Sequence, residues 1–444
     1  MEKQTEISMA EILPLRAWRY SENLTPQLED LTAPLFDVVS EKQRQMLYTN
    51  PLNSIHLSVP QGPDPAKNAS EILKSWKENG IIQQDLVPGI YVYYQYFRLP
   101  GERDERCRKG FIAHIKAYDW SERMILRHEN TIVSAVNDRI DLLRATEIQV
   151  SPTHGLYVDE ENQLECYMDM AMQLPLYELD DYQGVREVLG VIRDPKVIAK
   201  FLQVLASKQI ILADGHHRLE GAIEYRKEKA VNHAEAKWKG SDYHLIYLTN
   251  AQGNHLKILP THRLFHGLGF SKEELLKKLD EWFILRKFDD PEELGSYSFQ
   301  RKWSFGLVLD DESYVFKLKE DKFPQVRTDL PEVVRQLDLV ILHDVMFDKI
   351  LGISGHAQRN SDQITYERNF SRCLHEVRDG KASFAVITRE LELSQVLEVC
   401  STGEVLPQKS TYFYPKALGG LLFASINQEE FEFDYGAFFE QTEG

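Results

Sequence analysis

Residues 209–225 read QIILADGHHRLEGAIEY, and this stretch passes from a strand-like pattern to a helix-like pattern within a few residues. The apolar run that precedes the turn predicts a buried strand. Asp214 and Gly215 form a turn pair, because glycine permits a positive φ and a close approach of other backbone. The apolar residues from Leu219 onward recur at helical spacing and predict a helix that begins within residues 216–219. The sequence therefore places a polar cluster at the N-terminus of a helix.

The polar residues of this cluster suit an anion. Free backbone N–H groups and the helix dipole attract negative charge to a helix N-terminus. Arg218 adds a bidentate donor, and the two histidines can donate hydrogen bonds or transfer protons. Asp214 suits a phosphate only if a Mg²⁺ ion bridges the two or if the carboxylate acts as a base. We therefore predict a phosphate site whose binding residues are Gly215, His217 and Arg218. Its predicted catalytic residues are Asp214, His216 and His217, and Asp214 is also the predicted metal ligand.

A structural role is the alternative for the same residues: a capping aspartate, a turn glycine and surface histidines. A metal site built on the two adjacent histidines is disfavoured, because neighbouring residues rarely point at one ion and no HExxH motif follows. The sequence contains no GxxxxGK[ST] loop, no GxGxxG and no GxSxG. A nucleotide would therefore bind at an unusual site.

Composition excludes several classes of protein. The 444 residues carry a formal net charge of −17 and are 43% hydrophobic, which is enough to fill packed cores. No apolar run approaches the roughly 20 residues that a membrane helix needs, and the first residues do not resemble a signal peptide. The four cysteines are too dispersed for a disulfide framework or a zinc finger. We expect a cytoplasmic protein with no membrane partner; the acidic charge disfavours nucleic acid, and the oligomeric state stays open.

Strand-like and helix-like segments are mixed along the chain. We expect hairpins from 89–101 with 108–120, from 242–250 with 255–265, and within 302–320. We expect helices at 69–80, 138–147, 195–208, 271–283 and 331–352. This mixture predicts a mixed α/β (α+β) fold rather than a purely parallel sheet. We expect two domains: a hairpin-rich one over 1–268, which contains the DGHHR site, and a smaller α+β domain over 269–444.

Other polar residues are candidates for the same site. Glu129, beside His128, suits a general base or a metal ligand, although a polar loop explains the segment as well. His262 and Arg263 follow a strand and are predicted to form a second wall of one polar pocket, although a surface pair at a strand end explains them too. Basic and hydroxyl groups that suit an anionic ligand come late in the chain: Lys409, Ser410, Thr411 and Lys416. An alternating exposed strand explains that last segment equally well.

Three further positions are open to two interpretations. Arg139 and Arg144 flank an apolar helical pair, and they either reach a phosphate or pair with acids such as Asp141 and Glu147; the pairing is favoured. Ser151, in a turn that contains proline, is a candidate for contact with substrate.

The chain resembles an uncharacterised bacterial and archaeal family whose hallmark is ADGHHR at the start of a helix, the domain-of-unknown-function family one thousand and fifteen. The segments that carry the resemblance are LPLRAWRY (13–20), APLFDVVS (33–40), HENT (128–131), LLRATEIQVSPTHGLY (142–157), ADGHHR (213–218), LPTHRLF (259–265), LHDVMFDKILGI (342–353) and LPQKSTYFYPKALGGLL (406–422). The DGHHR stretch is also similar to the phosphate-binding signature of the ParB/sulfiredoxin superfamily. That likeness implies a nucleotide-binding core related to ParB proteins, sulfiredoxins and free-serine kinases.

The resemblance to free-serine kinases implies a function. It favours a phosphotransferase that uses ATP, ADP or CTP with Mg²⁺ and acts on free serine or a similar small hydroxyl metabolite. An upstream glutamate, here Glu129, would take the hydroxyl proton. The alternative is a non-catalytic, ParB-like nucleotide-binding regulator. A sulfiredoxin-like reductase ranks last, because that chemistry needs a cysteine where this sequence has His216.

Overall fold

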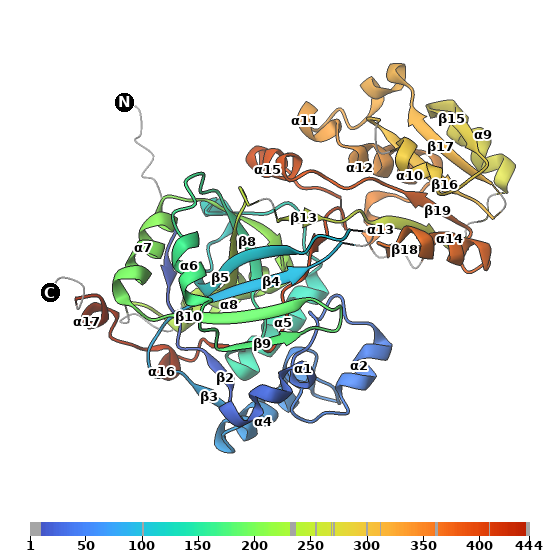
Figure 1. The fold of residues 1–444 in the computed structure, drawn as a ribbon. Helices are drawn as coiled ribbons and strands as arrows, with labels where there is room; N and C mark the ends of the chain where they lie inside the picture. Colours follow the sequence, from blue (N-terminus) through green and yellow to red (C-terminus); the bar gives the residue numbers. More distant parts are fainter. Residues whose placement is uncertain are drawn as a thin grey trace, which may run out of the picture. The chain divides into compact units, whose positions relative to one another are not determined.

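The computed structural model describes residues 10–440 except 100–101, 231–236, 254, 268, 270, 299–300, 311, 360–362 and 408. The chain divides into two compact units (Figure 1). Unit 1 comprises Met1–Arg127, Thr131–Leu256 and Pro415–Gly444, and unit 2 comprises His128–Asn130 and Lys257–Tyr414. The two contiguous domains expected from the sequence, 1–268 and 269–444, differ from these units because the chain returns to unit 1 after Tyr414. The expected boundary at residue 268 falls outside the described residues.

Unit 1 is built on a nine-stranded mixed sheet. Two neighbouring pairs are parallel, β6 with β11 and β8 with β12, and the other pairs are antiparallel. The expected hairpin of 89–101 with 108–120 is confirmed as β4 and β5. In spatial order the strands are β6 (Ile125–Leu126), β11 (Ile210–Asp214), β8 (Thr153–Tyr157), β12 (Tyr243–Asn250), β5 (Arg106–Lys116), β4 (Ile90–Phe97), β10 (Arg186–Ile192) and β9 (Tyr177–Asp180), with β1 (Ile12–Leu13) also paired to β5.

Both faces of this sheet are buried. Phe111 and Ile246 belong to one hydrophobic cluster, whereas their neighbours Ile112 and Leu245 belong to another. Since successive side chains of a strand point to opposite faces, the two clusters are the two sides of the sheet. The helices of unit 1 are α1 (Leu28–Leu31), α2 (Glu41–Leu47), α3 (Ile55–Ser58), α4 (Pro65–Glu78), α5 (Val133–Thr146), α6 (Glu165–Ala171), α7 (Pro195–Ala206), α8 (His216–Ala230), α16 (Gln428–Phe431) and α17 (Tyr435–Glu440).

Short strand pairs complete unit 1. β2 (Trp18–Tyr20) pairs with β3 (Ile82–Gln84), and β7 (Ile148–Gln149) pairs with β21 (Ala424–Ser425). The second pair joins the middle of the chain to the segment that returns from unit 2.

Unit 2 has its own six-stranded antiparallel sheet and its own core. The expected hairpin within 302–320 is confirmed as β16 and β17. The strand order is β15 (Phe283–Phe288), β17 (Ser313–Leu318), β16 (Ser304–Val308), β19 (Phe384–Ile387), β14 (His262–Phe265) and β18 (Ile364–Glu367). The helices include α9 (Lys272–Trp282), α10 (Glu293–Ser298), α13 (Gly355–Arg359), α14 (Phe370–Arg378) and α15 (Leu393–Thr402). Each unit mixes helices with sheet, so the predicted mixed α/β class is confirmed.

The expected hairpin of 242–250 with 255–265 is wrong. β12 pairs with β5 and β8 inside the sheet of unit 1. The next strand, β13 (Lys257–Ile258), pairs instead with β20 (Phe413–Tyr414) in unit 2. Because β12 is buried on both faces, it takes its partners from distant segments of the chain. The two runs therefore do not pair with each other, although the residues between them resemble a turn in sequence.

The expected helices at 69–80, 138–147, 195–208 and 271–283 are confirmed as α4, α5, α7 and α9. The single helix expected over 331–352 is wrong, because this segment forms α11 (Glu332–Arg335), α12 (Asp338–Ile341) and a π-helix over Leu342–Ile350. Leu337 is extended between the first two pieces. The Asp338 carboxylate accepts a hydrogen bond from the Trp303 backbone N–H at 2.9 Å, which anchors the break. Within the described part of the chain, no helix is long and apolar enough to cross a membrane.

Candidate anion-binding site

The turn between β11 and α8 requires a glycine. Gly215 has a φ of +90°, and a Cβ placed there would lie 2.6 Å from Cγ2 of Thr153 and 2.9 Å from Nη2 of Arg218. Any larger residue would be strained by the backbone angle and by these contacts. The predicted strand, turn and helix are therefore confirmed, with α8 beginning at His216.

Asp214 ends β11 and is 8% exposed. Its Oδ2 accepts a hydrogen bond from Nη2 of Arg218 at 3.1 Å, and its Oδ1 is bound by the Lys416 ammonium group. Two cations therefore share one buried carboxylate. Lys416 lies about two hundred positions downstream, and the sequence motif did not include it.

The predicted role of Asp214 as a Mg²⁺ ligand does not fit this geometry, because both of its oxygens already bind cationic side chains. In the described residues, no group of three or more His, Cys, Asp or Glu side chains is arranged to hold a metal ion. Arg218 and Lys416 place two positive charges beside the Asp214 carboxylate.

Arg218 connects the turn to a neighbouring part of unit 1. Its Nη1 donates to Oγ of Ser151 at 2.9 Å and to the carbonyl of Pro152 at 2.7 Å. Burial lowers the pKa of the guanidinium to about 10; the exposed Asp37 opposes this shift, and the charge of Arg139 adds to it. Arginine side chains in proteins carry a positive charge, so two like charges lie in the same buried part of unit 1.

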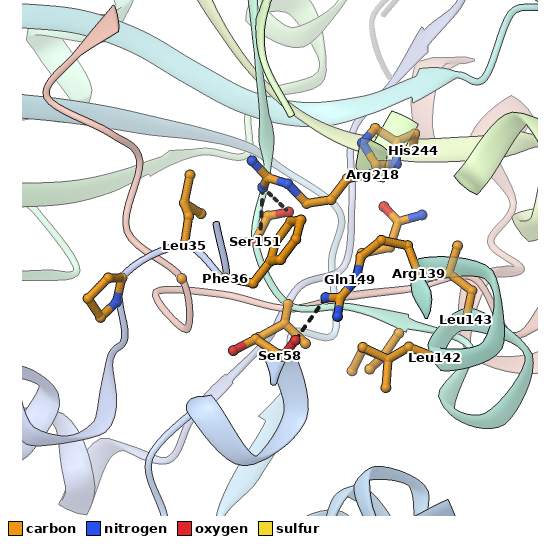
Figure 2. Close-up of a pocket in the computed structure, with 14 residues that line it drawn as sticks. Leu35, Phe36, Ser58, Arg139, Leu142, Leu143, Gln149, Ser151, Arg218 and His244 are labelled. Carbon is orange, nitrogen blue, oxygen red and sulfur yellow. Dashed lines mark hydrogen bonds between the residues drawn. The ribbon is translucent and has the colours of Figure 1, made fainter. Parts of the chain in front are cut away.

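These two arginines line one cavity of unit 1, which encloses about 560 Å³ including the part that is open to solvent. Figure 2 shows Arg139 and Arg218 around it together with Phe36, Ser58 and His244. Nη1 of Arg139 donates to the carbonyl of Ser58 at 2.8 Å, and its guanidinium carbon lies 4.4 Å from the centre of the Phe36 ring. The predicted contact of Ser151 with a ligand stays a prediction, and Ser151 is among the lining residues.

The two arginines of α5 have different surroundings. Arg144 pairs with Asp141 at 2.6 Å and Glu228 at 2.5 Å on the surface, as the structural interpretation predicts. Arg139 bonds to Asp138 and is buried, yet it also faces the cavity. Arg139 therefore faces the cavity while it is also bound to Asp138 and to the Ser58 carbonyl, whereas Arg144 lies at the surface outside the cavity lining.

The two histidines of the motif are fixed within unit 1. Nε2 of His217 accepts a hydrogen bond from the backbone N–H of Ile132 at 3.0 Å. This bond ties the start of α8 to the residue that precedes α5, so His217 has a structural task beside the predicted catalytic one. His216 is buried at the first position of α8.

The position of Lys416 is set by a row of buried polar side chains. Glu187, Gln95 and Arg108 lie opposite one another on β10, β4 and β5. Nε2 of Gln95 donates to Oε1 of Glu187 and to the Lys416 carbonyl, each at 3.0 Å. Arg108 donates to Oε1 of Gln95 and to the carbonyl of Pro415. The sheet thus holds the returning backbone that carries Lys416.

The remaining predicted residues belong to unit 2: Glu129, His262, Arg263, Lys409, Ser410 and Thr411. Nδ1 of His262 accepts from the Thr388 backbone N–H at 3.2 Å. Arg263 is fully buried and donates to the carbonyl of Thr261. Oγ1 of Thr411 lies 2.8 Å from Nε2 of His128, and the Ser410 hydroxyl donates to the Pro407 carbonyl. The structure therefore assembles the DGHHR residues within unit 1 and these residues within unit 2; the single pocket predicted for both sets stays a prediction.

Unit 2 contains a larger cavity, of about 1160 Å³ including its open part. Acidic side chains dominate the charged part of its lining, namely Asp344, Asp348 and Glu404 against Arg327. An acidic lining disfavours phosphate and carboxylate ligands. Of these two cavities, the one beside Arg218 is therefore the better candidate for an anion.

A family model described as "Protein of unknown function (DUF1015)" matches residues 12–340. The chain belongs to this family. The predicted family is therefore confirmed, and it carries no assigned activity. No curated protein matches significantly.

Several solved structures match weakly. A free serine kinase in complex with AMP is 14% identical, covers 68% of this chain and 86% of its own, and has a TM-score of 0.36. A conserved hypothetical protein from Pyrococcus furiosus is 12% identical, with 69% and 94% covered and a TM-score of 0.37. SbnI with a C-terminal truncation, from Staphylococcus aureus, is 10% identical, with 75% and 97% covered and a TM-score of 0.36. Similarity at this level does not establish a common fold.

Proposed function

We propose that this protein is a nucleotide-dependent phosphotransferase that acts on a small hydroxyl metabolite, with a ParB/sulfiredoxin-like nucleotide-binding core in unit 1. The observation that carries the proposal is the cationic cluster at the β11–α8 turn. Arg218 and Lys416 bind the two oxygens of Asp214, and Arg218 also lines a cavity with a second arginine. Free serine or a similar metabolite as the acceptor follows from the resemblance of the DGHHR motif to free-serine kinases.

The chain offers what phosphoryl transfer requires. Such reactions depend mainly on positioning and on neutralising the charge of the phosphoryl oxygens. A bound nucleotide, whether ATP, ADP or CTP, would supply the phosphoryl group. The close backbone at Gly215 and the first N–H groups of α8 suit phosphate oxygens, and Arg218 and Lys416 supply positive charge there. Asp214 holds both cations in place.

The predicted mechanism also includes a Mg²⁺ ion and a general base. No step is assigned to Mg²⁺, because the oxygens of Asp214 are occupied by cationic side chains. Glu129 as the general base remains a proposal, and a Glu129→Gln variant tests it. The expected result is a fall in kcat of at least a hundredfold with nucleotide affinity retained, since removal of a general base affects proton transfer and not binding.

The test is a phosphoryl-transfer screen with purified protein, ATP, ADP or CTP, and a panel of hydroxy acids and hydroxy amino acids that includes L-serine. Arg218→Ala and Lys416→Ala should abolish product formation, and Arg144→Ala should retain it because Arg144 lies on the surface. Nucleotide binding without any product would replace the enzyme with the non-catalytic regulator. A folded protein that neither binds nor turns over nucleotide would leave the turn with a structural role alone.

A further inference from the structure

Buried polar atoms of three side chains surround the cavity beside Arg218 and have no hydrogen-bond partner among the described residues. These atoms are Oγ of Ser58, Nε of Arg218 and both ring nitrogens of His244. His244 is 2% exposed. Leaving such a group unpaired is destabilising, and buried polar groups in proteins almost always have partners. Their concentration around one cavity indicates that a ligand completes their hydrogen bonds.

The charges around the cavity specify an anion. Arg139 and Arg218 both line it, whereas no carboxylate is among its described lining residues. The acids that act on the arginines lie outside this lining: Asp37 is exposed, Asp138 pairs with Arg139 but is 61% exposed in its side chain, and Asp214 is shared with Lys416. His244 adds no charge, since burial and the nearby Arg218 lower its pKa to about 3. An anion between the two guanidinium groups would relieve their mutual repulsion.

Apart from Gln149 and Ser151, the rest of the lining is apolar. Leu35, Phe36, Leu142, Leu143 and Val150 form much of the wall. A fully hydrated ion such as inorganic phosphate would leave this surface uncovered, whereas a molecule that joins an anionic group to a hydrocarbon or aromatic group would cover it.

We propose that this cavity binds a small organic anion. Its carboxylate or phosphate group lies against Arg139 and Arg218, its apolar part contacts Phe36, and a hydroxyl group bonds to His244 and Ser58. The next assignment rests on the proposed function: this molecule is the phosphoryl acceptor. An acceptor that carries an ammonium group fits less well, because the described lining offers no carboxylate to pair with it. The acceptor class is therefore an apolar hydroxy acid rather than free serine.

Binding without nucleotide tests the cavity separately from catalysis. Calorimetric titration of the full-length protein would compare phenyllactate with three analogues that each lack one feature. Phenylpropanediol lacks the carboxylate, lactate lacks the apolar group, and phenylalanine has an ammonium group in place of the hydroxyl. We expect phenyllactate to bind at least tenfold more tightly than each analogue. Phenyl phosphate in the same titration shows whether the arginines prefer a phosphate to a carboxylate.

Variants assign the binding to the cavity. Arg139→Gln should weaken phenyllactate binding at least tenfold, whereas Arg144→Gln, on the same helix but at the surface, should leave it unchanged. His244→Leu removes two unpaired nitrogens, so it should keep or raise the Tm of the ligand-free protein and still weaken binding. Ser58→Ala removes a hydroxyl that has no hydrogen-bond partner among the described residues. It should likewise keep or raise the Tm of the ligand-free protein and weaken phenyllactate binding.

Three results would overturn the proposal: no binding of any probe, equal binding of phenyllactate and phenylpropanediol, or unchanged binding in Arg139→Gln. The proposed function fails separately. Phenyllactate selectivity without a phosphorylated product in the screen would leave the cavity as a binding site of a protein that is not a kinase. A phosphorylated product with no selectivity among these probes would keep the kinase and refute this acceptor site.

Discussion

Gly215 is the residue on which the turn into α8 depends, and it allows a direct test. Gly215→Ala should lower the free energy of unfolding by about 3 kcal/mol, because the positive φ costs roughly 1–2 kcal/mol and the crowding against Thr153 adds to it. Gly184→Ala is the matched control: its φ is +75°, but nothing described lies within 4 Å of its Cβ position. That variant should cost only about 1 kcal/mol. Urea denaturation measures both free energies of unfolding. Equal losses in Gly215→Ala and Gly184→Ala would show that the crowding against Thr153 is relieved by a local shift.

The pairing of Asp214 with Lys416 can be measured by a double-mutant cycle. Asp214→Asn and Lys416→Met each leave a buried charge with less compensation, so each should cost about 3 kcal/mol of unfolding free energy. The double variant should cost clearly less than the sum of the two, because neither charge is left behind. Additive losses would mean that Arg218 alone balances the charge of Asp214.

Glu187 should make stability fall as the pH rises. Burial raises the pKa of this carboxyl to about 8, with Asp181 adding to the shift. Above pH 4.5 the unfolded chain releases this proton while the folded protein keeps it, so the unfolding free energy declines between about pH 4.5 and 8, by at most roughly 1.4 kcal/mol per pH unit. Glu187→Gln should remove this part of the slope. Urea titrations of both proteins at pH 5, 6 and 7 would measure the difference, and parallel curves would contradict it.

At the scale of elements, the returning segment over 415–418 depends on strands β4 and β5. Arg108→Met removes the donor to the Pro415 carbonyl and to Oε1 of Gln95, so it should cost about 3 kcal/mol and weaken anion binding by releasing Lys416. Lys109→Met is the control on the next residue. Lys109 forms ion pairs at the surface with Glu165 and Asp169, which are worth at most about 1 kcal/mol. Equal losses in the two variants would refute a special role for Arg108.

Local patterns were sufficient for some elements and insufficient for others. The β4–β5 and β16–β17 hairpins and the helices α4, α5, α7 and α9 follow from alternation, turn residues and helical periodicity, which are all local. The run over 242–250 was correctly recognised as a strand, but its partners β5 and β8 lie far away in sequence. The break between α11 and α12 lies beside the hydrogen bond that the Trp303 backbone N–H donates to Asp338, and no local pattern contains this contact.

At the scale of the whole molecule, each unit has its own hydrophobic core, so unfolding should involve more than one transition. Matched substitutions can assign them. Leu212→Ala in unit 1 and Leu264→Ala in unit 2 both truncate buried leucines and should each cost about 2–5 kcal/mol. In scanning calorimetry each variant should lower a different transition. A single transition that moves equally in both variants would show one cooperative molecule.

The candidate site could be predicted only in part, because several of its residues come from segments that are far apart in the sequence. The turn at Asp214–Arg218 is contiguous in sequence and was recognised from local chemistry. Phe36, Ser58 and His244 were missed because they reach the cavity from the N-terminal segment, from α3 and from β12. Lys416 is a sequence-based candidate for an anionic ligand, because it lies with hydroxyl groups in a segment of the family resemblance, but its pairing with Asp214 is not predicted. Its bond to Asp214 arises only when the chain has returned to unit 1.

That return has a consequence during synthesis on the ribosome. All the residues of unit 2 are translated before Lys416 emerges, and the pairing of β7 with β21 needs residues that come later still. While unit 2 is being synthesised, β7 and Asp214 of the nascent chain therefore lack these partners. A message that ends early, after Tyr414, would encode every residue of the DGHHR motif and yet produce a protein whose anion site lacks one of its two cations.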